Sequence, residues 1–420
     1  QLDLLALEKM LDDGADINCS HEHGQTALHQ VALIHSAKVA EFLLAKGADA
    51  NGVDALGCTP LHVAATANSV EVLRVLVHSG AASVEARTTG ELQTPLHHAA
   101  KRGATAAVKA MELHGADVHA RDRQGRTPLH MAVLHGHSET AQLLLDLGAD
   151  SSAEDDLGQS CLSLILLKMP PVAYKALGRF YHSDPIRRHQ CFNLTCLEPK
   201  PNAGIATHSE AQSPLKLIVS NQLFDVIKHP LVKKFIDLKW NSYGYAATWF
   251  HLALDFVYIS LWTVLCLSLP LRSPHIAPES SKEDAWKWVL LTVCGVWLLY
   301  KVVREILDFC KSRARLARWR CRCQRALEED LRFCHPEWPQ EEVYIRREME
   351  ELRNVKSYYL NDYWNIHDWL VNLLLLALLV VHAVHAIRQG DAVALLHVRV
   401  AAVALVPLWL SNLKHMRAFR

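Results

Sequence analysis

Two pairs of oxygen-bearing side chains have the spacing of a metal site. Glu305 and Asp308 form one pair, Asn365 and Asp368 form the other, and the members of each pair are three positions apart. On a helix such residues share one face, about 4.5 Å apart along the axis. Carboxylate and amide oxygens are ligands that Ca²⁺ prefers, with waters completing roughly six to eight ligands. If the two helix faces meet, these four residues form a regulatory calcium site.

The elements that must position these residues are apolar helices. Four apolar segments are found at about 247–269, 286–309, 365–387 and 392–413. The first and third are long enough to cross a bilayer, which takes about 20 residues. The second is uncharged over only 288–300, and the fourth contains Arg399 and Pro407. Lys and Arg are dense before the first segment, between the second and third, and after the fourth. By the positive-inside rule, this distribution predicts four spans with both ends in the cytosol.

The four oxygen ligands also have plainer interpretations. In one interpretation, they are simply polar helix ends close to lipid headgroups. In another, Asp308 pairs with a nearby cation, Lys301, Arg304 or Arg313. Acidic residues at membrane depth are functional more often than surface ones. We therefore retain the calcium hypothesis beside these alternatives. Arg399 stands alone, so the fourth segment does not have the repeated arginines of a strong voltage sensor.

The first 165 residues repeat themselves. Thr-Pro-Leu-His or a near copy begins at Thr26, Thr59, Thr94 and Thr127, at intervals of 33, 35 and 33 residues, with a worn copy at Ser160. Each copy is followed by Ala-rich and Leu-rich helical patterns and then by Gly-Ala-Asp or a variant. This period and signature resemble the ankyrin repeat. The resemblance implies a solenoid whose concave face is available to hold a protein partner or to bear force. The extra two residues of the second interval are expected in a loop, and the signature histidines are expected to bond backbone between repeats.

Residues 166–245 are predicted to be a cytosolic linker with short pre-membrane helices. Cys191 and Cys196 in this linker are candidates for redox sensing, because neighbouring Arg and His residues favour thiolates. The alternative is that they are two ordinary linker cysteines. The eleven cysteines of the chain show no framework spacing, which favours a reduced, cytosol-facing protein.

The link at 310–362 is strongly charged, with an Arg-rich first half and a Glu-rich second half. The simplest interpretation is a solvated helical hairpin. The basic residues also suit anionic lipid headgroups, which makes membrane lipids a predicted partner. The candidate lipid-facing residues are Arg313, Arg315, Arg318 and Arg320.

The approach to the first apolar segment resembles that of the transient receptor potential channels, and of their ankyrin subfamily most closely. It carries His229-Pro230, then Lys239-Trp240, then Gly244, after the repeats and before the first span. The resemblance implies an all-α fold, with an ankyrin solenoid (1–165), a linker (166–245) and a four-helix sensor-like membrane module (246–413). Residues 414–420 would begin the linker to a pore domain, which the chain would lack.

For function, the resemblance implies a homotetrameric, non-selective, Ca²⁺-permeable cation channel of the plasma membrane, with a cytosolic N-terminus. In that family an acid and an amide on the second helix face Asn-x-x-acid on the third. Glu305, Asn365 and Asp368 match this pattern, whereas Asp308 replaces the amide. The resemblance requires no cofactor beyond a regulatory Ca²⁺.

Other functional classes fit less well. An ankyrin-repeat protein acyltransferase also joins repeats to membrane helices, but the chain has no Asp-His-His-Cys tetrapeptide to supply its nucleophile. The chain is therefore expected not to be an enzyme. A membrane-tethered ankyrin adaptor is the remaining alternative. The chain has 44 basic and 44 acidic residues, so no bulk positive charge favours nucleic acid.

Overall fold

The computed structural model of the chain describes residues 4–80, 82–184, 189–198, 214–267, 285–334, 338–355, 359, 363–388 and 391–411. The predicted tail at 414–420 lies outside these ranges. The chain divides into two compact units. The first comprises Gln1–Ile236 and Arg322–Glu350, and the second comprises Asp237–Cys321 and Glu351–Arg420. The second half of the charged link therefore belongs to the same unit as the repeats.

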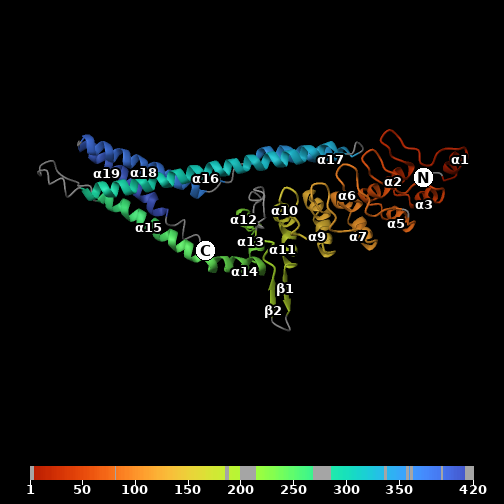
Figure 1. Cartoon of the computed structure of the whole chain (residues 1–420), viewed down its shortest axis with the longest axis horizontal. Coiled ribbons are helices and arrows are strands. Elements are labelled where there is room, and N and C mark those ends of the chain that lie inside the picture. The colour runs from red at the N-terminus through yellow and green to blue at the C-terminus, as the bar shows by residue number, and fades with distance from the viewer. Residues whose placement is uncertain are drawn as a thin grey trace. The chain divides into compact units, whose positions relative to one another are not determined.

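A stack of paired helices forms most of the first unit (Figure 1). After α1 (Leu4–Asp12), the pairs are α2 (Ala27–Ile34) with α3 (Ala37–Ala45), α4 (Pro60–Thr66) with α5 (Val70–His78), α6 (Pro95–Arg102) with α7 (Thr105–Leu113), α8 (Pro128–Leu134) with α9 (Ser138–Asp146), and α10 (Cys161–Lys168) with α11 (Pro170–Gly178). The first helix of each pair packs on the first helix of the next pair. One continuous apolar core runs through the stack.

The Thr-Pro-Leu-His signature explains both the helix starts and the stacking. In the second copy, Thr59 caps α4, and the backbone N–H of Thr59 donates to Nδ1 of His62 (3.1 Å). The opposite ring nitrogen, Nε2, then carries the proton and donates to the carbonyl of Gln93 in the next repeat (3.1 Å). His29 and His97 make equivalent bonds. The expectation that the signature histidines bond backbone between repeats is confirmed for these three, whereas Nε2 of the fourth, His130, has no hydrogen-bond partner among the described residues.

A short hairpin follows the stack and corrects the expectation of an all-α chain. Strands β1 (Tyr181–Asp184) and β2 (His189–Phe192) pair antiparallel, with Tyr181 opposite Phe192. Their rings contact each other at 5.2 Å between centroids. This cross-strand aromatic pair stabilises a hairpin whose strands are too short to show a clear alternating pattern in the sequence. The expected short pre-membrane helices are present as α12 (Pro214–Ser220), α13 (Phe224–Ile227) and α14 (Pro230–Lys239).

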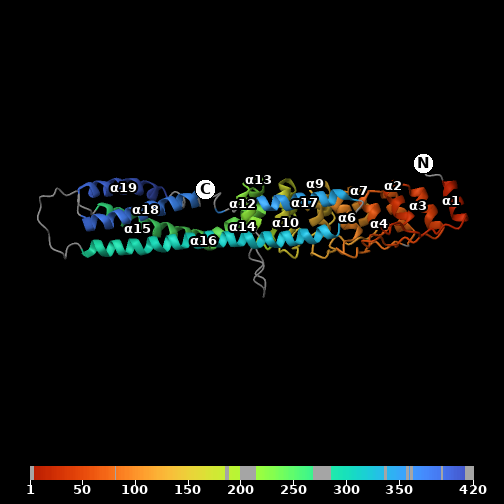
Figure 2. The ribbon, with the colours of Figure 1, turned by 90° about the horizontal axis from the view of Figure 1, so that it is seen from above.

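The second unit is a bundle of long helices. After a π-helical turn, η1 (Trp240–Gly244), come α15 (Tyr245–Leu267), α16 (Ala285–Arg332), α18 (Tyr363–Arg388) and α19 (Asp391–Leu410). Helix α16 is one uninterrupted helix that contributes residues to both units (Figure 2), and α17 (Pro339–Asn354) follows it in the first unit. The buried side chains of the bundle form their own core, which includes Tyr258, Trp262 and Leu375.

The bundle does not show four membrane spans. Among the described residues, two helices are long and apolar enough to cross a bilayer, Pro230–Leu267 and Tyr363–Val384. The apolar part of α19, Leu395–Leu410, is shorter than a span needs. Helix α16 does not qualify as a span, because charged residues such as Lys301 and Glu305 follow its short apolar stretch. The four helices that we predicted are present, but by length and composition only two of them qualify as spans.

Candidate functional site

Residues 322–334 and 338–350, which we call the docked segment, pack on the stacked repeats. They comprise the end of α16 and most of α17. Three ion pairs join the docked segment to the repeats: Arg126 with Asp330 (2.8 Å), Lys101 with Glu341 (3.1 Å) and Lys168 with Glu348 (2.8 Å). These contacts lie within one compact unit. The Glu-rich half of the link is therefore paired with the repeats and is not the solvated hairpin that its composition suggested.

Two of the three ion pairs are buried. The side chains of Lys101 and Glu341 are 10% and 7% exposed, and those of Arg126 and Asp330 are 9% and 13% exposed. Burial by itself lowers the pKa of Lys101, but Glu341 and Glu91 more than offset this, so the pKa lies above its usual value. Removing one partner of a buried pair leaves an uncompensated charge and is strongly destabilising. These pairs consequently fix where the docked segment binds.

Arg126 is the centre of the largest polar group. Its guanidinium donates to both oxygens of Asp330 and to Asp122, which is itself buried. Gln124 donates a further bond to Asp330 (2.7 Å). Such fork-shaped recognition of a carboxylate is geometrically specific. The loop before α8 thus forms a specific binding site for the carboxylate of Asp330.

Aromatic side chains of the docked segment make the remaining contacts. Phe333 packs directly on Gly90, where a Cβ atom would lie only 2.3 Å from the ring. The Trp338 ring lies 6.0 Å from that of His98. Tyr344 donates its hydroxyl to the carbonyl oxygen of Leu134 at the end of α8 (2.6 Å). Aromatic anchors with satisfied polar groups are typical of specific interfaces.

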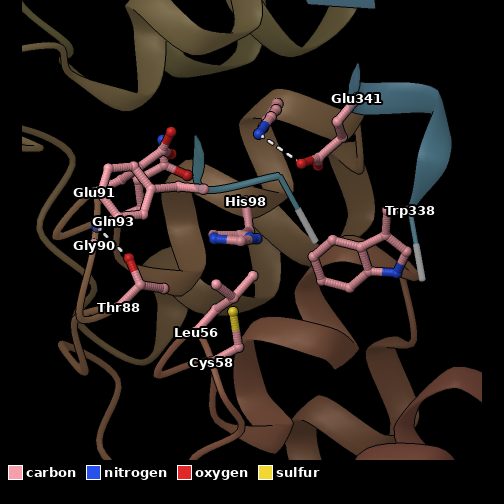
Figure 3. A pocket seen from close by; sticks show the side chains of 11 residues that line it. Leu56, Cys58, Thr88, Gly90, Glu91, Gln93, His98, Trp338 and Glu341 are labelled. Carbon is pink, nitrogen blue, oxygen red and sulfur yellow. Dashed lines mark hydrogen bonds and ion pairs between the residues drawn. The ribbon is translucent and has the colours of Figure 1, made fainter. Parts of the chain in front are cut away.

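A small cavity lies beneath the docked segment (Figure 3). Its volume is about 20 Å³, which holds one water molecule. Figure 3 shows His98 between Trp338 on one side and the loop residues Glu91 and Gln93 on the other. Among the described residues, Nε2 of Gln93 and Oε1 of Glu341 are buried without a hydrogen-bond partner. Both residues line this cavity, which has room for a water molecule and is too small for an organic ligand.

Of the four predicted calcium ligands, the structure links two through a tyrosine. Tyr359, just before α18, donates its hydroxyl to Glu305 of α16. Asn365 donates its amide to the carbonyl oxygen of the same tyrosine (2.9 Å), and Trp369 donates to the tyrosine hydroxyl (3.1 Å). The middle of α16 and the start of α18 therefore lie close together, as the calcium hypothesis requires. The tyrosine that joins them was not anticipated.

The two other predicted ligands are partly buried. Nδ1 of His367 lies 4.0 Å from Asp368, and Asp308 is on the same helix as Glu305. The described part of the chain has no group of three or more His, Cys, Asp or Glu side chains arranged to hold a metal. The calcium site therefore stays a prediction. One alternative partner for Asp308, Lys301, is instead paired with Asp255 (2.8 Å).

The predicted basic residues follow one stretch of α16. Arg313, Arg315 and Arg318 are exposed, and Arg320 is half-buried. Arg313 lies over the ring of Phe309, at 5.8 Å from its centroid. Exposed arginines just beyond an apolar helical stretch are positioned to meet lipid headgroups, but lipid binding itself stays a prediction.

The two linker cysteines have different environments. Cys191 is exposed on β2, and Cys196 is buried, with its Sγ 3.4 Å from the carbonyl oxygen of Asn193. Burial raises the pKa of Cys196 to about 12, which disfavours the reactive thiolate. Both are free thiols. Redox sensing by this pair stays a prediction, with Cys191 as the accessible member.

The docked segment is a site that we did not predict from the sequence. One signal was available: the two-residue excess in the second repeat interval falls in the loop between α5 and α6, and that loop carries Gly90 and Glu91. A second was the spacing of Glu341, Tyr344 and Glu348, at i, i+3 and i+7, which places them on one face of α17. Because two of these three side chains are charged, no apolar stripe marks the face.

Comparison with known proteins agrees with the first unit. Residues 3–88 and 82–155 match the family model of ankyrin repeats in three copies, so the stack is an ankyrin-repeat array. The chain is thus mostly helical and carries ankyrin repeats in its N-terminal part. Over 287 residues, 62% of this chain, it is 22% identical to Transient receptor potential cation channel subfamily A member 1 of Drosophila melanogaster. The chain spans 22% of the length of that relative.

Proposed function

We propose that the chain is part of a subunit of a non-selective, Ca²⁺-permeable cation channel, with the ankyrin array as its cytosolic sensor. One observation carries the proposal. The similarity to the channel covers 62% of the chain, whereas the stacked pairs end at Gly178, so the similarity cannot be confined to the repeats. It must include part of the helices that follow, which contain the two candidate spans.

The ion pair between Lys301 and Asp255 supports a four-helix membrane module despite the charges of α16. Its two atoms are 2.8 Å apart, and the Lys301 ammonium also lies over the ring of Tyr258 at 4.2 Å. Charged residues within membrane bundles face inward and pair with one another. In this proposal α16 and α19 also cross the membrane, with Lys301 of α16 paired to Asp255 inside the bundle, and the subunits assemble as a homotetramer in the plasma membrane.

The docked segment supplies the proposed coupling between sensor and membrane module. Helix α16 is continuous from the bundle into the docked segment, and the docked segment is held by ion pairs to three successive repeats. A stimulus that changes the stacking of the repeats would therefore act on α16 directly. The alternative route for this coupling is the linker that enters the bundle through α14 and η1.

Recording from cells that express the complete protein tests the proposal. We expect a cation current, carried by both Na⁺ and Ca²⁺, that is evoked by heating, electrophiles or osmotic stretch. Gly90→Ala should change the stimulus threshold, because its new methyl group displaces Phe333. Gly178→Ala is the matched control, since nothing lies within 4 Å of its Cβ position. Membrane-inserted protein without current under any stimulus would refute the channel.

The finding of two spans favours a second candidate, a membrane-tethered ankyrin adaptor. Two membrane-crossing helices are enough to anchor an array without forming a pore. Accessibility labelling of single cysteines placed at the ends of α16 and α19 separates the two candidates. Labelling from opposite sides of the membrane at the two ends of each helix supports the four-helix module, and labelling from one side supports the adaptor.

A further inference from the structure

The region beneath the docked segment has more carboxylates than cations. The charged groups that face Glu91 come from the repeats and from the docked segment: Lys101, Asp122, Arg126, Asp330, Glu341 and Glu348. Lys101 pairs with Glu341, and Arg126 is shared by Asp122 and Asp330. Glu348 pairs with Lys168. Among the described residues, Glu91 makes no ion pair of its own and is left over as a carboxylate.

We propose that Glu91 is a proton-binding site through which cytosolic pH controls the binding of the docked segment to the repeats. Docking covers Glu91, because Phe333 packs on the adjacent Gly90 and Asp330 lines the same cavity as Glu91. A proton on Glu91 removes the charge that this covered, acid-rich region cannot neutralise. The docked state therefore takes up a proton that the undocked state releases to solvent.

The electrostatics of Glu91 agree with this assignment. Burial raises the pKa of Glu91 from 4.5 to about 7, and Asp330 and Asp122 add to the rise while Lys101 and Arg126 oppose it. Because the pKa is raised in the docked state, docking is strongest in acid and weakens as pH rises through 7. For this shift, the equilibrium constant for docking falls about tenfold between pH 6 and pH 8.

Other titratable groups around the cavity come from the same elements: Cys58, His98, His135, Cys334 and Tyr344. Burial lowers the pKa of His135 to about 2 and raises that of Cys334 to about 11, so neither changes charge between pH 6 and 8. Burial also raises the pKa of the Cys58 thiol. His98 is the neighbour whose titration must be separated from that of Glu91 by mutation.

Hydrogen exchange of α17 amides in the full chain, held in detergent micelles, tests the proposal. After correction for intrinsic exchange, we expect the opening constant of α17 to rise about tenfold from pH 6 to pH 8. Glu91→Gln mimics the protonated form and should hold the constant at its acid value throughout, and Glu91→Ala should also abolish the pH dependence. Glu71→Gln, at an exposed glutamate of α5, should behave as wild type.

His98→Asn identifies the titrating group. We expect the pH dependence to persist in His98→Asn and to vanish in both Glu91 variants, with circular dichroism confirming that each variant keeps its helices. A wild-type opening constant that does not change between pH 6 and 8 would overturn the proposal. The proposal would also be overturned if the opening constant still depended on pH in Glu91→Gln, or if it no longer did so in His98→Asn. The test is independent of whether the protein conducts ions.

Discussion

A single methyl group at position 90 should release the docked segment. The Cβ of Gly90→Ala would lie 2.3, 2.6 and 2.9 Å from Cδ1, Cε1 and Cγ of Phe333. These distances are far below van der Waals contact, and three atoms of one rigid ring cannot move aside independently. Gly90 does not have a positive φ, so alanine fits the backbone there and the clash is the main effect.

The expected cost follows from overpacking of a close contact, which is typically about 1–3 kcal/mol. Since roughly 1.4 kcal/mol is a tenfold change in an equilibrium constant, the opening constant of α17 should rise about 5- to 150-fold. The cost falls on docking because Gly90 is not part of the apolar core that runs through the stack. Hydrogen exchange should therefore speed up in α17 and stay unchanged in α6 and α8.

Two variants sharpen this measurement. Phe333→Ala in the Gly90→Ala background removes the ring that the methyl group strikes, so the two changes should be strongly non-additive. Gly178→Ala adds the same methyl group where nothing lies within 4 Å, and should leave α17 as in wild type. Unchanged exchange of α17 in Gly90→Ala, in a protein that keeps its helical circular dichroism, would show that Phe333 does not dock on this loop.

Three further predictions concern other parts of the chain. Lys101→Glu places like charges against Glu341 and should cost docking roughly 3–5 kcal/mol, with partial recovery in Lys101→Glu/Glu341→Lys, measured by the same exchange experiment. Asp368→Ala and Glu305→Gln should abolish the dependence of gating on cytosolic Ca²⁺ in patch recordings, and an unchanged response would remove the calcium site. Because burial lowers the pKa of His62 from 6.5 to about 4, its contribution to folding is present above pH 6.5 and is lost as pH falls towards 4, by about 3 kcal/mol; thermal unfolding of the wild type should show this loss, and His62→Gln should reduce it.

The repeats could be predicted because their determinants are local. Thr-Pro-Leu-His encodes a capped helix start within four residues, and the same histidine supplies the bond to the next repeat. Periodicity therefore gave the helix pairs and even the role of the histidines. The worn last copy, at Ser160, still begins a helix because its serine accepts the same type of capping bond, from the N–H of Ser163.

The docked segment could not be predicted because its determinants are not local. Asp330 is recognised by Arg126 across 204 residues of sequence, and Tyr344 by Leu134 across 210. A hydropathy pattern does not reveal such contacts when charged side chains make them. The calcium candidates show the same limit at shorter range: their i, i+3 spacing was visible, but Tyr359, which contacts both Glu305 and Asn365, lies outside either pattern.

The positions of three contact residues along α17 explain why their contacts with the repeats act together. Glu341, Tyr344 and Glu348 lie on one helix face, and they contact α6, α8 and α10 in turn. A rigid helix that contacts three successive repeats fixes the spacing between those repeats. Any change in the curvature of the array must therefore break at least one of the three contacts or carry α17 with it. Because the helices of each repeat also pack on those of the neighbouring repeats, we expect the array to release the docked segment without unfolding.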